Sequence, residues 1–480
     1  MKENSISRRT FLKSSALVGA AGMVGTGSVL TSCEGGDGAA KIVPIKEPGT
    51  YYVPNLAMNK ANEGRELKAG IIGCGGRGSG AAQNFLNAGT GITITALGDA
   101  FPDSIERCAN MLKERFNIDV PANKRFTGLD NYKQVIDSDV DIVLIASPPF
   151  FRPEQFQYAV EKGKHCFLEK PLFVDAVGYR SAMASSRQAD AKNLCVVTGT
   201  QRHHQRSYVA SYKQVMDGMI GEITGGAVYW NGTVPWTRLP QPGMSDGEGM
   251  IRNWVNMIWA SGDHIVEQHC HNLDVWTWFT GMKMVSALGF GSRQRRPSGD
   301  SFDNFSIDFV MENGIHVHSM CRQIDGCAGG VYEFIQGTKG SWSTQQGHVI
   351  KDLAGNEIWK YDAEAERAEF EQVDPYTLEH VNWINHIRSG VHINQAPEMA
   401  IANMAAVMGR QSCYTGGLIT WDEMTTSDLD LRPKDLSLSG KMDMSVYKVP
   451  VPGISPEEAA VQAAARRAER AAQGGQRPQQ

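Results

Sequence analysis

Short apolar runs and amphipathic stretches alternate over residues 67–190. The apolar runs lie at 67–72, 92–97, 141–147 and 165–169, and helical periodicity fills 153–163 and 176–189. Short buried strands separated by helices predict a parallel, doubly wound α/β sheet of the Rossmann type. Ligands of such sheets lie beyond the carboxyl ends of the strands, where Asp99, Ser147 and Glu169 fall.

The pattern changes near residue 193, after which strand-like segments dominate. They lie at 196–200, 224–230, 284–290, 306–311, 315–319 and 332–335, with helical stretches at 207–217, 267–279, 377–387 and 397–415. This order predicts a C-terminal α+β domain with a large, mostly antiparallel open sheet. The expected organisation is a signal (1–33), a tether (34–63), a Rossmann domain (64–192), a substrate-binding domain (193–450) and a solvated or disordered tail (451–480).

The first residues have the pattern of an export signal. Arg8-Arg9 precedes a short apolar stretch of small residues, 15–30, which is typical of a twin-arginine signal and lies outside the fold. The stretch ends in Leu30-Thr31-Ser32-Cys33, which resembles a bacterial lipobox. An ordinary cleavage site that contains Cys is the alternative. We expect an exported protein, in the periplasm or cell envelope, held to the membrane by a lipid on Cys33.

Composition narrows the possible partners. The 480 residues carry a net charge of -5, and no basic stripe predicts nucleic-acid binding. The nine cysteines show no CxxC spacing and are interpreted mainly as buried thiols, with a Cys321–Cys327 pair left open.

A glycine-rich turn follows the first predicted strand. The segment Gly73-Cys74-Gly75-Gly76-Arg77-Gly78 has the spacing of a dinucleotide pyrophosphate loop. Gly73 permits the turn, Gly75 lets the backbone approach the phosphates, and Gly78 allows close helix packing. A glycine-rich loop without a cofactor is the alternative.

Asp99 ends the second strand, where a ribose-binding acid is expected. Its charge would repel a 2′-phosphate, which favours NAD over NADP, although the nearby Arg77 weakens that argument. Because twin-arginine substrates cross the membrane folded, we expect the cofactor to be bound before export and then retained.

Lys170, in the triplet Glu169-Lys170-Pro171, ends a buried strand at the expected crevice. A buried ammonium must be paired or used in chemistry. Lys170 could hydrogen-bond a reacting hydroxyl and ease its proton loss. A structural lysine paired with Glu169 or with a cofactor phosphate is the alternative.

The segment 263–274 is dense in polar groups and opens an otherwise apolar helix. Glu267 and His271 stand four residues apart, so on an α-helix they share one face and could orient a diol and accept its proton. A pair of structural hydrogen bonders is one alternative. A metal held by these two with His264 and His269 is another, but no zinc-ligand spacing matches and no metal is predicted.

Together, the glycine loop, the Glu169-Lys170-Pro171 triplet and the Glu267/His271 pair with Asp274 resemble the Gfo/Idh/MocA oxidoreductases. The resemblance implies NAD(P) in an N-terminal Rossmann domain, a sugar or polyol over the C-terminal sheet, Lys170 as the catalytic lysine and His271 as the acid/base. Two features depart from the family pattern: Glu267 stands where Asp is usual, and Phe151-Arg152 follows a strand end that often carries His.

Further substrate contacts are expected from Arg202 and His203, which follow a strand end; a solvated loop is the alternative. Ser147 and Glu169, with the glycine loop and Asp99, are expected to contact the cofactor. Open sheets of this kind usually pair, so a homo-oligomer through the C-terminal sheet is expected.

The sequence therefore predicts an NAD-dependent oxidoreductase that acts on a secondary alcohol of a sugar or glycoside, with a tightly bound cofactor. One alternative is a glycoside hydrolase or lyase with an internal NAD redox cycle and no net redox. Another is a sugar-binding lipoprotein with a relic active site. Family glycosidases generally differ around the Lys170 triplet, which favours the dehydrogenase.

Overall fold

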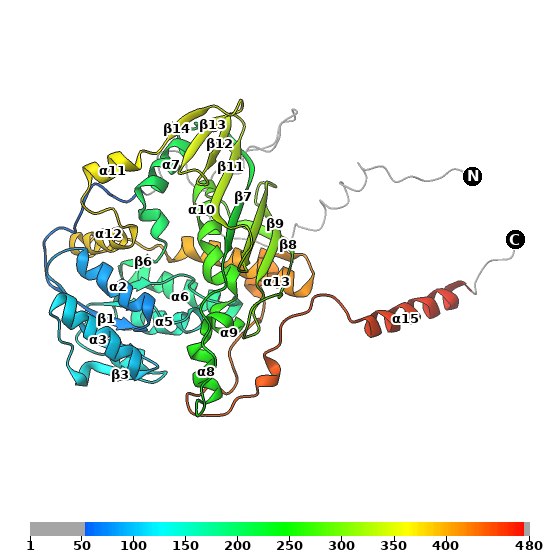
Figure 1. The fold of residues 1–480 in the computed structure, drawn as a ribbon, viewed down its shortest axis with the longest axis horizontal. Helices are drawn as coiled ribbons and strands as arrows, with labels where there is room; N and C mark the ends of the chain where they lie inside the picture. The colour runs from blue at the N-terminus through cyan, green and yellow to red at the C-terminus, as the bar shows by residue number, and fades with distance from the viewer. Residues whose placement is uncertain (1–52, 475–480) are drawn as a thin grey trace. The chain divides into compact units, whose positions relative to one another are not determined.

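A six-stranded parallel sheet forms the N-terminal domain (Figure 1). This computed structural model describes residues 53–474. The strand order is β3-β2-β1-β4-β5-β6. The strands are β1 Leu67–Ile72, β2 Ile92–Asp99, β3 Arg125–Thr127, β4 Ile142–Ile145, β5 His165–Leu168 and β6 Val196–Thr198. The predicted doubly wound sheet is confirmed, and its order reverses between β1 and β4, where a ligand crevice is expected.

Five helices connect these strands and cover the sheet. They are α2 Gly76–Asn87, α3 Pro102–Phe116, α4 Asn131–Ile136, α5 Arg152–Glu161 and α6 Ala176–Ala191. Helix α3 begins with Pro102, whose fixed φ suits a first helical turn, and ends at Asn117 in the left-handed conformation. Ile71, Phe85 and Leu144 are fully buried between the layers. Burial of these apolar faces stabilises the domain.

The sixth parallel strand lies beyond the boundary expected from the sequence. β6 pairs with β5 in parallel, in the register Cys166↔Val196 to Leu168↔Thr198. The first domain therefore extends past residue 192, to about residue 200. A short apolar run of this length fits a parallel or an antiparallel strand equally well, so the pattern alone could not assign its sheet.

A second sheet of nine strands forms the C-terminal domain. Its order is β14-β13-β12-β11-β7-β10-β9-β8-β15, and β7 with β10 is its parallel pair among the described residues. The strands are β7 Ile223–Gly232, β8 Met284–Ser292, β9 Asn304–Met311, β10 His316–Gln323, β11 Gly330–Gly337, β12 Gly340–Ser343, β13 Val349–Asp352, β14 Glu357–Lys360 and β15 Ile419–Thr420. The predicted mostly antiparallel sheet is confirmed.

Two long helices cover the inner face of this sheet: α10, Cys270–Thr280, and α13, Ala396–Thr415. Every residue of α10 is buried, which explains its lack of a polar face. The remaining helices are α7 Arg206–Met216, α8 Asp246–Arg252, α9 Ile258–Ser261, α11 Ala363–Glu369, α12 Pro375–Ser389, α14 Trp421–Thr426 and α15 Pro456–Gly474.

Two segments outside the 64–192 boundaries pack on the parallel sheet's domain. Trp383 of α12 lies in the same core cluster as Phe85 and Phe167, and its indole donates to the Cys195 carbonyl oxygen at 3.2 Å. Ala61, within the expected tether, is buried there and donates to Ala88 O at 2.7 Å. The part of the tether that the structure describes, 53–63, is therefore attached to the domain.

The C-terminal segment has little contact surface. Residues 451–469 are exposed, and Ser455 and Glu458 exchange the hydrogen bonds of a capping box at the start of α15. Within residues 53–474, no helix combines the length and apolarity that crossing a membrane requires.

Candidate active site

The loop between β1 and α2 has the geometry of a phosphate cradle. Gly73 has a φ of +89°, and a Cβ at Gly78 would lie 1.7 Å from the Gly73 carbonyl oxygen. A Cβ at Gly75 or Gly76 would meet no atom within 4 Å, so open space lies over the start of the helix. No side chain caps the first N–H groups of α2. An anionic dinucleotide fits this cradle, because the free N–H groups and the helix dipole both favour negative charge.

Asp99 ties the loop to the end of β2. One carboxylate oxygen accepts from Cys74 N at 2.7 Å and the other from Phe101 N at 2.9 Å. Burial raises the pKa of Asp99 above its ordinary value, although these N–H donors oppose the change. The carboxylate stands beside the glycine loop, as a ribose ligand should, with each oxygen retaining acceptor capacity.

Glu169 pairs with Arg77 and not with Lys170. The Arg77 Nε atom lies 2.6 Å from Glu169 Oε1, and the guanidinium stands 4.8 Å over the ring of Tyr376 on α12. Glu169 is buried, and Gly199 leaves the room for its carboxylate. The charge of Arg77 is thus partly neutralised, which reduces its attraction for a 2′-phosphate.

Ser147 forms the wall behind the glycine loop. A Cβ at Gly73 would lie 2.5 Å from Ser147 N, so the loop runs directly against the end of β4. The Ser147 hydroxyl donates to Gln155 of α5. Its expected contact with the cofactor stays a prediction.

Lys170 reaches across to the second domain. Its ammonium donates to the Glu267 carbonyl oxygen at 2.5 Å and lies 3.4 Å from Glu267 Oε1. Burial lowers the pKa of Lys170, but the nearby Glu267, Cys270 and Glu169 together outweigh this effect, so the pKa stands above the ordinary lysine value. Lys170 is therefore a protonated donor, joined to the segment that carries Glu267 and His271.

Glu267 lies in a π-helical turn, Ile265–His269, that precedes α10. In a π-turn the bonds run between residues five apart, so a backbone oxygen is released from the α-helical ladder. The Glu267 carbonyl oxygen accepts from Lys170. The expected i,i+4 face of a regular α-helix therefore does not describe how Glu267 and His271 are placed.

His271 is buried against Trp230, with ring centroids 5.8 Å apart and nearly parallel planes. Burial, and then the positive charges of Lys170 and Arg202, hold the pKa of His271 well below its usual range. The neutral imidazole offers a ring-nitrogen lone pair to a proton, although burial and the nearby cations lower its basicity, whereas protonated Lys170 can only donate.

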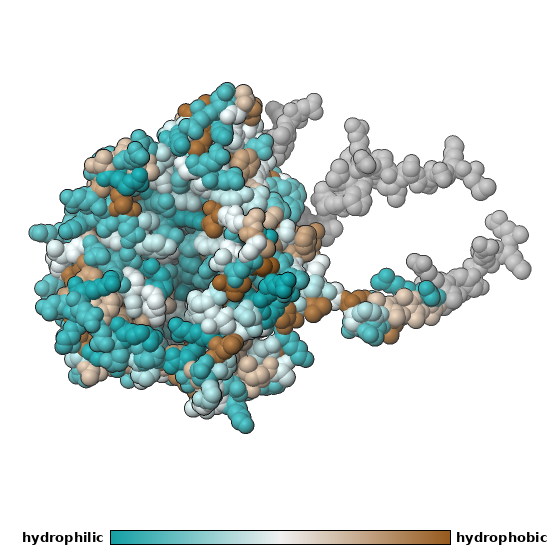
Figure 2. Space-filling model, viewed as in Figure 1, coloured by the Kyte–Doolittle hydropathy of each residue, from teal (hydrophilic) through white to brown (hydrophobic). Residues whose placement is uncertain are grey.

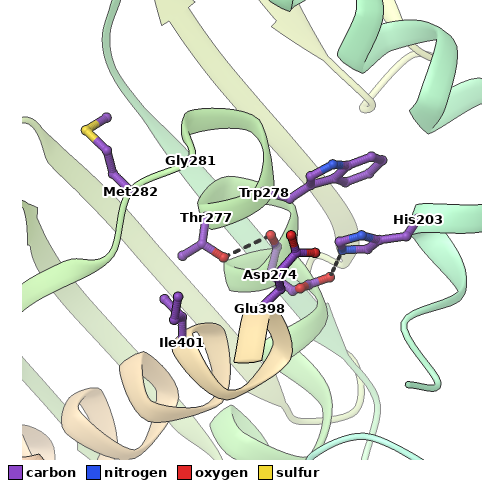
Figure 3. Close-up of a pocket in the computed structure, with 8 residues that line it drawn as sticks. All are labelled: His203, Asp274, Thr277, Trp278, Gly281, Met282, Glu398 and Ile401. Carbon is purple, nitrogen blue, oxygen red and sulfur yellow. Dashed lines mark hydrogen bonds and ion pairs between the residues drawn. The ribbon is translucent and has the colours of Figure 1, made fainter. Parts of the chain in front are cut away.

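Asp274 and His203 form a second group with a pocket of its own (Figure 3). His203 Nε2 lies 2.8 Å from Asp274 Oδ2, and the imidazole stacks on Trp278 at 4.1 Å between centroids. The pocket has a cavity volume of about 90 Å³. Figure 3 shows Glu398 of α13 pointing toward the same pair. Lys170 and His271 do not line this pocket, so the predicted site residues fall into two neighbouring groups.

Arg202 is held inside the C-terminal domain. Its guanidinium lies 2.5 Å from Glu333 Oε1, and Glu333 is fully buried on β11. Glu333 also accepts from Tyr208, Asn272 and Thr344. This network orients Arg202, and its expected contact with substrate stays a prediction.

Arg152 and Tyr376 lie at the site without having been predicted there. Arg152 is buried and donates to the Pro171 carbonyl oxygen at 2.5 Å, and burial lowers its pKa to about 10. It therefore supports the turn that carries Lys170. Arg152 follows a strand end, and that position could have predicted it. No local pattern predicts Tyr376, which α12 brings to the site.

Metal binding and thiol pairing have little support in the described part of the chain. No group of three or more His, Cys, Asp or Glu residues there could hold a metal ion. All eight described cysteines are free, Cys321 and Cys327 included. Cys33 lies outside the described residues.

The geometry defines an α/β protein with a dinucleotide-type glycine loop and a second domain whose Glu267 contacts Lys170. Residues 67–200 match the Gfo/Idh/MocA family model, described as "Oxidoreductase family, NAD-binding Rossmann fold", so this part of the chain is similar to that family. Residues 5–25 match the twin-arginine translocation signal, which supports export from the cytoplasm. The predicted resemblance to the Gfo/Idh/MocA oxidoreductases, the NAD-binding Rossmann domain and the export signal are confirmed.

Named relatives differ in the reaction that their names describe. A glycosyl hydrolase family 109 protein of Shewanella pealeana is 26% identical over 383 residues, which cover 74% of this chain and 78% of that protein. An inositol 2-dehydrogenase of Cereibacter sphaeroides is 30% identical over 169 residues, or 35% and 47% of the two chains. Matches to other family 109 proteins, such as that of Streptomyces coelicolor, cover about half of their length.

Solved structures share the fold. A scyllo-inositol dehydrogenase of Lactobacillus casei, with bound NAD(H) and scyllo-inositol, has a TM-score of 0.56 and 21% identity. The match covers 74% of this chain and 99% of that one. At this identity the similarity establishes the fold alone.

Proposed function

We propose that the protein is an NAD-dependent oxidoreductase that acts on a secondary alcohol of a sugar or glycoside. The observation that carries this proposal is the Lys170–Glu267 contact beside a neutral His271. It joins Lys170, at the carboxyl end of β5, to the segment of the second domain that carries His271. The inositol dehydrogenases among the relatives support a polyol or sugar as substrate.

NAD, when bound, supplies the hydride acceptor. The substrate carbon loses a hydride and its hydroxyl loses a proton. His271 accepts that proton, because its pKa keeps the imidazole neutral. Lys170 donates a hydrogen bond to the hydroxyl oxygen and stabilises the charge that develops there. The Glu267 carboxylate holds Lys170 in place and can orient a neighbouring hydroxyl.

The cofactor would be NAD rather than NADP, bound before export and retained. Asp99 beside the loop disfavours a 2′-phosphate, and Glu169 partly neutralises Arg77. The test is to denature purified protein and identify the released nucleotide and its redox state. Then a panel of sugars and glycosides is added to intact protein, and reduction of the bound nicotinamide is followed by absorbance. Absence of any nucleotide binding would contradict the proposal.

A second candidate is glycoside cleavage through an internal NAD redox cycle. The family 109 glycosyl hydrolases among the relatives favour it. In that reaction a ring carbon would lose a hydride to NAD, and the glycosidic bond would then be eliminated with loss of the proton next to the new ketone. Water would add to the resulting double bond, and the hydride would return to the ketone carbon, so that the net change is hydrolysis. A chromogenic glycoside cleaved at steady rate without added acceptor would favour this candidate. Net accumulation of a ketone product with an acceptor would favour the dehydrogenase.

The export signal and Cys33 suggest a lipid-anchored envelope protein. The small residues before Cys33 and the Gly-rich segment after it support lipidation at this position. Metabolic labelling with a radioactive fatty acid tests this, with Cys33→Ala as the control that should lose the label and the membrane association. A released, unlabelled wild-type protein would exclude the anchor.

The outer face of the nine-stranded sheet would pair with a second copy. Phe290, Met320, Tyr229 and Tyr332 lie in one row across it, with Tyr229 and Tyr332 stacked at 4.5 Å between centroids. Figure 2 shows hydrophobic colour among hydrophilic residues in the area that β8 and β9 occupy in Figure 1. Sedimentation of wild type against Phe290→Asp, which should be monomeric, tests this pairing.

A further inference from the structure

A compact apolar cluster covers one side of the parallel sheet's carboxyl edge. Its buried members come from α8, α9 and the chain after α14, and include Met250, Trp259 and Met442. The residues that pack against it from the first domain follow three strand ends: Phe101 after β2, Leu129 after β3, and Phe150 with Phe151 after β4. Strand ends in such sheets border the ligand crevice.

The adenosine end of a dinucleotide belongs on this side. Asp99, the expected ribose ligand, also ends β2, and it accepts a hydrogen bond from Phe101 N. Phe101 therefore stands two residues from the ribose position and is held to it through the backbone. A contact that holds Phe101 in place would therefore narrow the exit from the expected adenosine position.

Arg252 of α8 fixes Phe101 from the other domain. Its guanidinium lies 3.8 Å from the Phe101 ring centroid, and its Nη2 atom is 3.0 Å from Asp103 Oδ1. Glu248 accepts from Arg252 Nε at 2.8 Å and holds the guanidinium in place over the ring. A planar cation over an aromatic face combines cation–π attraction with a directional ion pair, which lysine cannot reproduce.

A segment near the C-terminus holds α8 in position. We name residues 429–447 the strap. Leu431 N donates to Asp175 of the first domain at 2.8 Å, and Met442 N donates to Asp246 of α8 at 2.9 Å. A Cβ at Gly247 would lie 1.9 Å from Ser437 O, so the strap runs directly on α8. The strap thus connects the two domains across this end of the crevice.

We propose that α8 and the strap form a clamp that closes the adenosine end of the NAD site, with Arg252 as its contact on Phe101. The clamp retains the cofactor after export by slowing its release, and it does not take part in the chemistry. This inference rests on the proposed NAD site. It assigns a role to α8, which makes no hydrogen bond or ion pair with Lys170 or His271 in the part of the chain that the structure describes.

The test compares Arg252→Ala with Arg107→Ala. Both arginines pair with Asp103, but Arg107 lies on α3 and does not reach the second domain. Each protein is loaded with NADH, and release is followed by nicotinamide fluorescence after addition of excess NAD. Nucleotide retained through gel filtration is measured separately. We expect release at least about tenfold faster in Arg252→Ala and within about twofold of wild type in Arg107→Ala.

Arg252→Lys makes the test independent of folding defects. It keeps the charge opposite Asp103 but loses the planar stack, so release should be faster than in wild type and slower than in Arg252→Ala. Equal release from wild type and Arg252→Lys, or equally fast release from Arg107→Ala and Arg252→Ala, would overturn the clamp. A wild-type protein that binds no NAD would overturn the proposed function and the clamp together. A wild-type protein that binds NAD and releases it as fast as the Arg252 variants would overturn the clamp alone.

Discussion

The cofactor edge and the side-chain cluster of this protein are built in different ways. We call the loop 73–78 with Asp99 the cofactor edge, and Lys170, Glu267, His271, Arg202 and Glu333 the side-chain cluster. At the cofactor edge the backbone makes the site, and its contacts join residues about 25 apart, as in Cys74 N to Asp99. In the cluster, charged side chains meet across 97 residues in Lys170–Glu267 and 131 in Arg202–Glu333.

The difference has a physical consequence. A backbone cradle keeps its shape while the local turn is intact. A cluster of buried charges depends on every member, because removing one leaves another buried without its partner. Mutations should therefore lower cofactor affinity at the edge, but reaction rate or folding stability in the cluster.

Lys170→Ala should have the largest effect. Loss of the donor to the reacting oxygen should lower kcat by at least about 100-fold, while bound NAD per protein stays near the wild-type value. Turnover under saturating substrate and nucleotide content after denaturation are the two measurements. Unchanged activity would support the interpretation of the protein as a sugar-binding lipoprotein with a relic site.

Acid should destabilise the fold through two buried histidines, His204 and His269, which lie two residues along the chain from Arg202 and His271 of the side-chain cluster. Burial lowers the pKa of His204 and of His269 to about 3. Because each folded-state pKa lies below the unfolded value of about 6.5, the unfolded chain binds the proton first. Their stabilising contribution is complete above about pH 6.5. It decreases as the pH is lowered below that value, by up to about 1.4 kcal/mol per pH unit for each group.

Chemical denaturation at several pH values between about 7 and 5 measures this slope. His204→Gln removes one titrating group, so the slope should become shallower by up to about 1.4 kcal/mol per pH unit. An identical slope in the variant would show that His204 is not buried neutral in the folded protein.

Glu333→Ala should destabilise the fold by about 3 kcal/mol. It leaves Arg202 charged and buried, and it removes the acceptor for Tyr208 and Asn272. Denaturant unfolding measures the change, and Glu357→Ala on the exposed part of β14 is the control, expected within about 0.5 kcal/mol of wild type. Equal stability of the two variants would contradict the burial of the pair.

Gly78→Ala should have the smallest of these effects and should act on the cofactor. The new Cβ would displace the Gly73 carbonyl oxygen, and NAD affinity should fall by about tenfold. Gly80→Ala is the matched control in the same helix, because its Cβ would meet Arg77 only at 3.5 Å. Titration of both variants with NAD measures the affinities; similar values would show that the loop tolerates displacement.

Much of the fold follows from local pattern. Strands β1, β2, β4 and β5 and helices α5, α6, α10 and α13 lie where the apolar pattern predicted them, since the strands are short buried apolar runs and the helices bury their apolar residues. β6 was assigned to the other domain, because strand pairing depends on distant partners. The short strands β12 to β15 and the helices α8 and α9 lack a period long enough to detect.

The site residues likewise divide into those that local spacing predicts and those whose pairing depends on distant residues. The glycine loop and Asp99 are readable because their spacing along the chain sets the turn, and Lys170 because it ends a buried strand. Its pairing was not readable: Glu267, rather than the adjacent Glu169, holds it, and a π-turn supplies the carbonyl oxygen.

By itself the sequence determined the export signal, the parallel sheet, the dinucleotide loop and the residue types that chemistry requires, because each depends on neighbours within a few turns or strands. Only the tertiary structure decided which charges pair, where α12 and β6 pack, and how α8 and the strap close over Phe101. Many of those contacts join distant residues, 97 positions apart in Lys170–Glu267 and 256 in Asp175–Leu431, and burial, which no local pattern encodes, selects them.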